Sequence, residues 1–126
     1  MRGIAFLFFF TAAICVTIGM AWGIHMSASG DHTMSPAHAH LNLIGWVTFG
    51  LFGVYYHLVP GAAEGTLPKV HYAISLAAIV LITPGIAMAV TEQGEGMAKI
   101  GSLLAIVSML MFLFVVFRSR GGAQTA

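Results

Sequence analysis

The sequence predicts an all-α integral membrane protein built as a four-helix bundle. Of its 126 residues, 59% are hydrophobic and only 7% are charged, whereas a soluble domain carries about 25% charged residues. The apolar residues gather in four segments, each long enough for a helix that crosses the ~30 Å hydrocarbon core of a bilayer. These segments are residues 3–23, 37–59, 68–90 and 98–117, followed by a tail at 118–126. The composition excludes a soluble fold, and the net charge of +1 gives no indication of nucleic-acid binding.

The first segment, residues 3–23, follows Arg2, a combination that also occurs in secretory signal peptides. We expect it to remain in the protein as the first span. Small residues recur along it at a spacing of three to four, which indicates close contact with another helix. They are Ala12, Val16, Gly19 and Gly23.

The other three segments also read as helices. Lipid offers the backbone no hydrogen-bond partners, so an apolar run of this length must satisfy its own backbone as a helix. None of the runs alternates as a barrel strand does. Pro36 and Pro68 suit the first turns of the second and third helices. We expect one domain over residues 1–126, with a disordered tail from Gly121 onward.

The positions of lysine and arginine predict the orientation. If there are four spans, one side of the membrane carries most of the cations, namely Arg2, Lys69, Arg118 and Arg120. Lys99 lies on the other side, near Asp31, Glu92 and Glu95. The positive-inside rule therefore places both termini in the cytoplasm. Because Glu92 and Glu95 lie in a loop and not in a span, a proton pump based on carboxylates is not indicated.

His38 and His40 open the second span, where an ionisable side chain indicates function. Residues two apart on a helix point about 200° apart, so the two rings face nearly opposite directions. Chelation of one ion from one helix would need a spacing of four. The observed spacing suits a helix that gives one ligand to a cofactor on each side. Haem, which takes axial histidines, is the natural candidate.

Asn42 and Gly45 lie on the same predicted face as His38. Asn42 is a candidate to hold a histidine ring or a haem propionate, or to bond to a neighbouring helix. Gly45 would let a porphyrin approach the backbone, or else let another helix pack closely. His57 and His71, at the other ends of their helices, are expected to be interfacial or hydrogen-bonded side chains and not ligands.

Part of this span resembles a known family. The matching residues are His38-Ala-His40, Gly45-Trp46, Tyr56 and Leu58-Val59-Pro60. They resemble the tenth transmembrane helix of the haem-copper oxidase catalytic subunit, most closely in the C-type oxidase and nitric oxide reductase branch. In that family the first histidine binds the high-spin haem and the second binds the low-spin haem. The resemblance implies that His38 and His40 are axial ligands of haem iron.

The resemblance also implies an assembly. The family's catalytic subunit has twelve helices in three similar groups of four, and this chain is similar to one group. A homotrimer would complete the arrangement by closed symmetry, with His38 of one protomer facing His40 of the next across a haem b. We expect a cytochrome b-like electron carrier in a bacterial inner membrane, with the histidine pair near the periplasmic side. Its redox partner is not indicated.

The chain departs from the family at the copper site, because it has no adjacent pair of histidines. Whether it is an enzyme therefore stays open, and no catalytic residue is assigned. A second hypothesis is a copper-binding or copper-handling membrane protein, since thioether and imidazole ligands suit copper. Its ligands would be the outer-loop residues His25, Met26, His32 and Met34. A third hypothesis is an accessory oxidase subunit in which the histidines serve packing.

Overall fold

The computed structural model describes residues 1–121, so the tail predicted to be disordered lies almost wholly outside the described residues. Within the described part the chain is helical and has no strand. The elements are α1 (Gly3–Ser29), α2 (Ser35–His40), the π-helix η1 (Leu41–Thr48), α3 (Phe49–Leu58), the 3-10 helix η2 (Pro60–Ala63), α4 (Leu67–Val90) and α5 (Gly96–Arg118).

The four predicted spans are confirmed as helices that are long and apolar enough to cross a membrane. α2, η1 and α3 join into one span, Ser35–Leu58, and α1, α4 and α5 form one span each. Pro36 and Pro68 lie in the first turns of their helices, as predicted. Large apolar side chains are exposed along all four spans, which is what a surface facing lipid requires.

The first helix is longer than predicted. It continues past Gly23 to Ser29 and ends where Gly30 adopts a left-handed conformation with φ 69°, as glycine often does at a helix end. The prediction that placed His25 and Met26 in the outer loop is therefore wrong. The apolar run stops at residue 24, but nothing in residues 24–29 breaks a helix, so the backbone hydrogen bonds continue.

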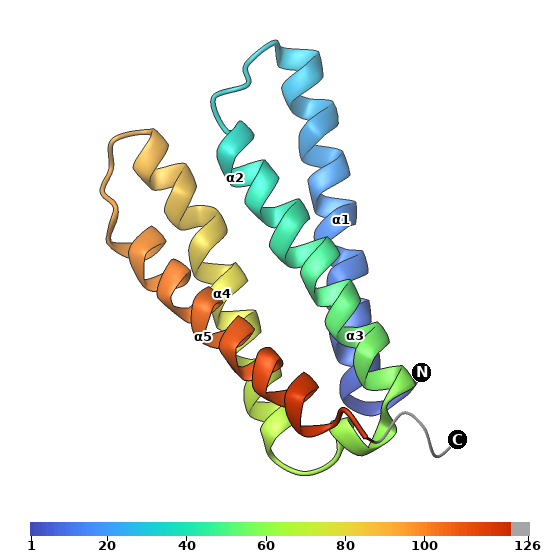
Figure 1. The fold of residues 1–126 in the computed structure, drawn as a ribbon. Helices are drawn as coiled ribbons and strands as arrows, with labels where there is room; N and C mark the ends of the chain where they lie inside the picture. Colours follow the sequence, from blue (N-terminus) through green and yellow to red (C-terminus); the bar gives the residue numbers. More distant parts are fainter. Residues whose placement is uncertain (122–126) are drawn as a thin grey trace.

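The helices form two antiparallel hairpins that lie side by side (Figure 1). One consists of α1 with α2, η1 and α3, and the other of α4 with α5. Both described termini and the connection through η2 lie at one end of the bundle, here named the terminal end. The turns at residues 30–34 and 91–95 lie at the opposite end, here named the loop end.

Glycines allow the helices of each hairpin to approach closely. A Cβ on Gly53 of α3 would lie 2.9 Å from the backbone nitrogen of Phe9 in α1. A Cβ on Gly101 of α5 would lie 2.6 Å from the backbone nitrogen of Ile82 in α4. Neither contact leaves room for a side chain, so the glycines set the interhelical distance.

Aromatic rings fill the core between the two hairpins. Phe8 of α1 is fully buried and packs edge to face against Phe49 and Phe52 of α3, with ring centroids 5.4 Å apart. Phe112 of α5 closes the cluster, at 4.4 Å from Phe52. Such contacts stabilise beyond their buried area by about 0.5–1.5 kcal/mol each, so this cluster joins the two hairpins.

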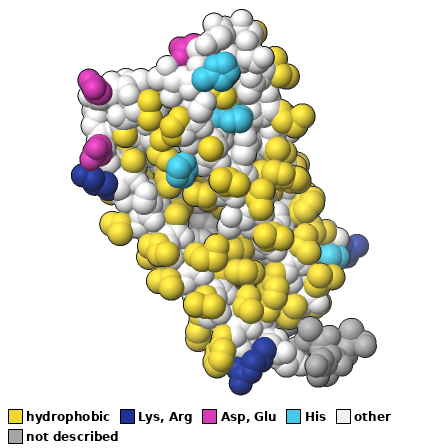
Figure 2. Space-filling model, turned by 45° about the horizontal axis from the view of Figure 1, so that its top comes forward, with side chains coloured by type: hydrophobic (Ala, Val, Ile, Leu, Met, Phe, Trp, Pro, Cys, Tyr) yellow, Lys and Arg dark blue, Asp and Glu magenta, His cyan; other side chains and the backbone are white. Residues whose placement is uncertain are grey.

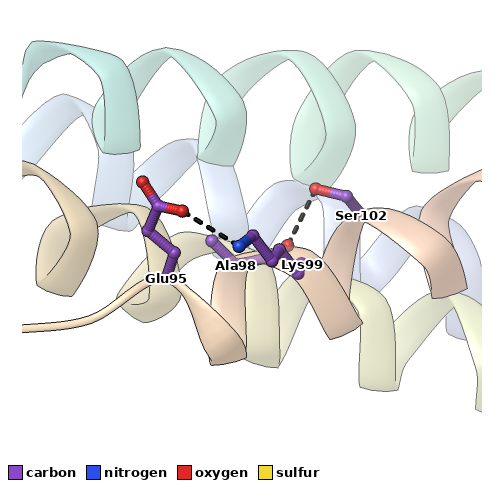
Figure 3. Close-up of polar contacts among 4 residues, drawn as sticks. All are labelled: Glu95, Ala98, Lys99 and Ser102. Carbon is purple, nitrogen blue, oxygen red and sulfur yellow. Dashed lines mark hydrogen bonds and ion pairs between the residues drawn. The ribbon is translucent and has the colours of Figure 1, made fainter.

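The surface is a broad belt of hydrophobic side chains, with histidines gathered near the loop end, which Figure 2 turns forward. Cations at the loop end are balanced locally. Lys99 forms an ion pair of 3.0 Å with Glu95, one turn earlier on α5, and the hydroxyl of Ser102 donates to the Ala98 carbonyl oxygen over 2.8 Å (Figure 3). Both charged side chains are well exposed.

Candidate functional site

His38 and His40 project to different elements, as their spacing predicts. Both lie in α2, the short helix that Pro36 begins and that the π-helix η1 follows. The His38 ring turns onto α1, where its Nε2 donates to the Gly19 carbonyl oxygen over 2.9 Å. The His40 ring lies instead at a groove bounded by α4 and α5.

The His38 side is a small polar cluster set into a notch of α1. A Cβ on Gly23 would lie 3.3 Å from the His38 Nε2, so Gly19 and Gly23 together make room for the ring. The amide nitrogen of Asn42 lies 3.1 Å from the same Nε2, while its Oδ1 is buried without a partner. Two donors meet here while the Oδ1 acceptor has no partner in this amide orientation, and the reverse orientation would turn Oδ1 toward the ring N–H.

The His40 ring is oriented by its own helix. Its Nδ1 lies 2.8 Å from the Pro36 carbonyl oxygen. A carbonyl only accepts, so Nδ1 carries the proton and Nε2 carries the lone pair. A metal-bound histidine is held in the same way, with its second ring nitrogen donating to a carbonyl. His40 therefore presents a ligand nitrogen whose tautomer is already fixed.

The groove beside His40 has a volume of about 340 Å³, within the range of pockets that hold organic ligands. Its walls are mostly apolar, with hydroxyl groups from three of the helices. The lining residues are His40, Ile44, Thr48, Phe49, Phe52, Ser75, Ala78, Ile82, Ser102, Ala105, Ile106, Ser108 and Met109. A mostly apolar ligand with a few polar groups suits such a lining.

The π-helix was not predicted, and it follows His40 directly. η1 runs over eight residues, and the Thr48 hydroxyl donates to the carbonyl oxygen of Leu43, five residues earlier, over 2.9 Å. π-helical turns are rare and occur frequently at functional sites. No apolar period in the sequence distinguishes this stretch from an ordinary helix, so the pattern carried no signal for it.

Gly45 and Asn42 both lie on the His38 side, facing α1. A Cβ on Gly45 would lie 2.8 Å from the Cys15 side chain and 3.4 Å from Ile79. The space over Gly45 is therefore filled by helix packing, which favours that interpretation over room for a porphyrin. Asn42 contacts the His38 ring, which favours its role in holding the histidine.

The proposed copper ligands differ in exposure and lie on different elements. His25 is exposed and Met26 is buried on the last turns of α1, and His32 lies exposed in the following turn with its Nδ1 3.3 Å from the Gly30 carbonyl oxygen. Hydrogen bonds from Thr33 lower the pKa of the nearby Asp31 carboxyl. Within residues 1–121 no group of three or more His, Cys, Asp and Glu side chains is placed to hold a metal ion.

The largest polar cluster inside the bundle was missed by the sequence analysis. His71 of α4 is 0% exposed and bonds to Tyr56 of α3 and Ser108 of α5. His71 is hydrogen-bonded, as expected, but it is not interfacial, whereas His57 is exposed. Of the residues in this cluster, only Ser75 lies near His71 in the sequence, one turn later. The other hydrogen-bond partners of His71 come from different helices, so their proximity could not be predicted.

Comparison of the chain with protein-family models, with curated proteins and with solved structures found no match. The function below is therefore inferred from the geometry of the chain and from the resemblance of its second span.

Proposed function

We propose that this protein is a membrane haem protein that carries electrons, with His38 and His40 as axial ligands of haem b. The orientation of His40 carries the proposal. Its Nδ1 donates to the Pro36 carbonyl oxygen, so its Nε2 is free to bind iron beside an apolar groove. Bound haem iron would supply the one-electron step between its ferric and ferrous states.

The groove residues fit a haem. Ile44, Ala78 and Ile82 offer apolar contacts to a macrocycle, and Thr48 and Ser102 offer hydroxyl groups to polar edges. His40, half-buried at this groove, would hold the iron.

His38 fits as a ligand only after a local change. Its Nε2 is bound to the Gly19 carbonyl oxygen, and loss of a hydrogen bond of this kind costs about 0.5–1.5 kcal/mol. With Nε2 as the ligand nitrogen the ring proton would lie on Nδ1, and the unused Oδ1 of Asn42, one turn away, is an acceptor for it. The cost is small compared with the strength of an axial bond to iron.

The two ligands of one iron would come from two chains. His38 and His40 of a single chain face α1 and the groove by α4 and α5 respectively, so they do not converge on one point. A closed ring of protomers brings His38 of one chain to His40 of the next. We propose a homotrimer, the assembly that the resemblance implies.

The charge distribution supports an orientation with both termini in the cytoplasm of a bacterial cell and the histidine pair toward the periplasm. Arg2, Lys69 and Arg118 belong to the terminal end, whereas Lys99 at the loop end is paired with Glu95. Cytoplasmic ends of membrane proteins carry the excess of lysine and arginine.

The test is an optical spectrum of the protein purified from haem-replete membranes, oxidised and reduced with dithionite. The wild type and the control His57→Ala, which removes an exposed histidine, should show a haem Soret band. His40→Ala should lose most of the haem, because it removes the preoriented ligand. Absence of haem from the wild type, or full occupancy in a variant lacking both His38 and His40, would overturn the proposal.

A second candidate has one open haem face. The bond between His38 and Gly19 favours it, since a His38 that stays on α1 leaves His40 as the single axial ligand. Such a haem binds dioxygen or nitric oxide. Carbon monoxide should then shift the Soret band of the reduced wild-type protein, whereas a haem with two histidine ligands should not respond.

Metal content tests the copper hypothesis, and the subunits that co-purify test the accessory-subunit hypothesis. Elemental analysis that finds copper without iron would favour a copper site at His25, Met26, His32 and Met34. Purification with other oxidase subunits, instead of as a homo-oligomer, would favour the accessory role.

A further inference from the structure

A continuous chain of hydrogen bonds crosses the interior of the bundle. The Tyr56 hydroxyl lies 2.9 Å from Nδ1 of His71, and Nε2 of His71 lies 3.3 Å from Oγ of Ser108. Oγ of Ser108 lies 2.6 Å from Oγ of Ser75. The four side chains come from α3, α4 and α5, and each is at most 4% exposed.

The donor in each hydrogen bond can be assigned by starting from the His71 carbonyl oxygen, which can only accept. Ser75 donates to the His71 carbonyl oxygen over 2.7 Å, so Ser75 accepts from Ser108. Ser108 has given its proton, so it accepts from Nε2 of His71. Nδ1 is then the acceptor and Tyr56 is the donor. Every proton of the chain is assigned, and each points the same way, from Tyr56 toward the serines.

The serine end of this series of hydrogen bonds reaches the groove beside His40. Ser75 and Ser108 line it, together with Ser102 and His40. Ser102 is exposed and lies one turn after Lys99, at the loop end (Figure 3). The groove lining therefore extends from Ser102, near the loop end, to the buried hydroxyl groups of Ser75 and Ser108.

The other end points toward the terminal end of the bundle. Val59, one turn after Tyr56, lines a second cavity of about 320 Å³ with Arg118 and Ser119. The hydroxyl of Tyr55 bonds to that of Ser119 over 2.8 Å. Polar groups thus lie beyond Tyr56 as well as beyond Ser108.

His71 is the one side chain in this hydrogen-bonded series with a separate donor nitrogen and acceptor nitrogen, so a proton can enter the ring at Nδ1 while another leaves from Nε2. The side chains around it are Tyr56 from α3, Ser75 from its own helix, Ser108 from α5, and the rings of Phe8, Phe52 and Phe112. The four Asp and Glu side chains of the protein are all exposed, namely Asp31, Glu64, Glu92 and Glu95. A proton crossing this interior therefore depends on the imidazole, not on a carboxylate.

We propose that Tyr56, His71 and Ser108 form a proton-transfer path between the groove and the terminal end of the bundle. In one passage, Tyr56 gives its hydroxyl proton to Nδ1 and the proton on Nε2 moves to Oγ of Ser108. Ser108 passes its own proton to Ser75, Ser75 turns from the His71 carbonyl oxygen and releases its proton to water in the groove, and Tyr56 regains one from the terminal end. Each step breaks one O–H or N–H bond and forms another, and no electron is transferred. Rotation of the hydroxyls and exchange of the imidazole tautomer restore the starting state.

The test measures proton flux into liposomes that contain the purified protein and a pH-sensitive dye, driven by a potassium diffusion potential. The readout does not require haem, so it is independent of the proposed function. Tyr56→Phe and Ser108→Ala keep the shape of their sites and remove one link each. Thr17→Ala is the control, because the exposed Thr17 hydroxyl on α1 lies outside the groove and bonds only to the Ala13 carbonyl oxygen of its own helix.

The proposal predicts a flux above that of protein-free liposomes for the wild type and for Thr17→Ala, and a return to the protein-free rate for both Tyr56→Phe and Ser108→Ala. A purely structural role for the chain would leave the flux of folded variants unchanged. A wild-type flux equal to that of protein-free liposomes, equal flux in all variants, or loss in Thr17→Ala as well would overturn it.

Discussion

At the residue scale, the histidine pair shows how much a spacing can predict. A spacing of two residues on a helix puts the rings of His38 and His40 on different sides, and the structure has them there. The partners of each ring were not predictable, because Gly19 belongs to another helix. The orphaned Oδ1 of Asn42 and the fixed tautomer of His40 likewise arise from contacts that the sequence does not display.

Gly45 gives a prediction at this scale. Gly45→Ala places a methyl group 2.8 Å from the Cys15 side chain, and such overpacking costs about 1–3 kcal/mol. Its matched control is Gly50→Ala on the same span, where the nearest atom to the new Cβ would be 4.0 Å away. Thermal unfolding of the haem-free protein in detergent should show a lower midpoint for Gly45→Ala only. An unchanged midpoint combined with loss of haem would instead favour room for a porphyrin.

At the element scale, composition and length determine the helices well, and local geometry determines their ends. The four spans were predicted because lipid permits few other structures. α1 ends at Ser29 because of the conformation of Gly30 and not because its apolar run continues. The π-helical turns of η1 are not revealed by the period of its own residues.

Gly101 tests the packing of α4 on α5. A methyl group there would lie 2.6 Å from a backbone nitrogen of Ile82, where no rotamer change can relieve the clash. Gly101→Ala should therefore destabilise by about 3 kcal/mol or more, at the upper end of overpacking costs. Gly96→Ala, at the start of α5 with open space around it, should be close to neutral. Similar unfolding midpoints for the two variants would contradict the close approach of these helices.

At the scale of the whole molecule, the two hairpins meet through the aromatic rings around His71 and leave a groove between them that His40 borders. The sequence predicted the four-helix bundle but neither the buried polar cluster nor the groove. Tyr56, His71 and Ser108 are brought together only by tertiary packing. Because the rings of His38 and His40 point in different directions, the proposed haem site would need ligands from two chains of the proposed homotrimer.

The most direct test of the account is complementation between two defective chains. His38→Ala and His40→Ala are purified separately and as a co-expressed mixture, and the low-spin spectrum of haem with two histidine ligands is measured. Each variant alone should lack that spectrum. In the mixture, random closed assembly joins an intact His38 to an intact His40 at about a quarter of the interfaces, so a corresponding share of the signal should return. A mixture that recovers none of it, while the wild type shows it fully, would contradict a haem shared between protomers.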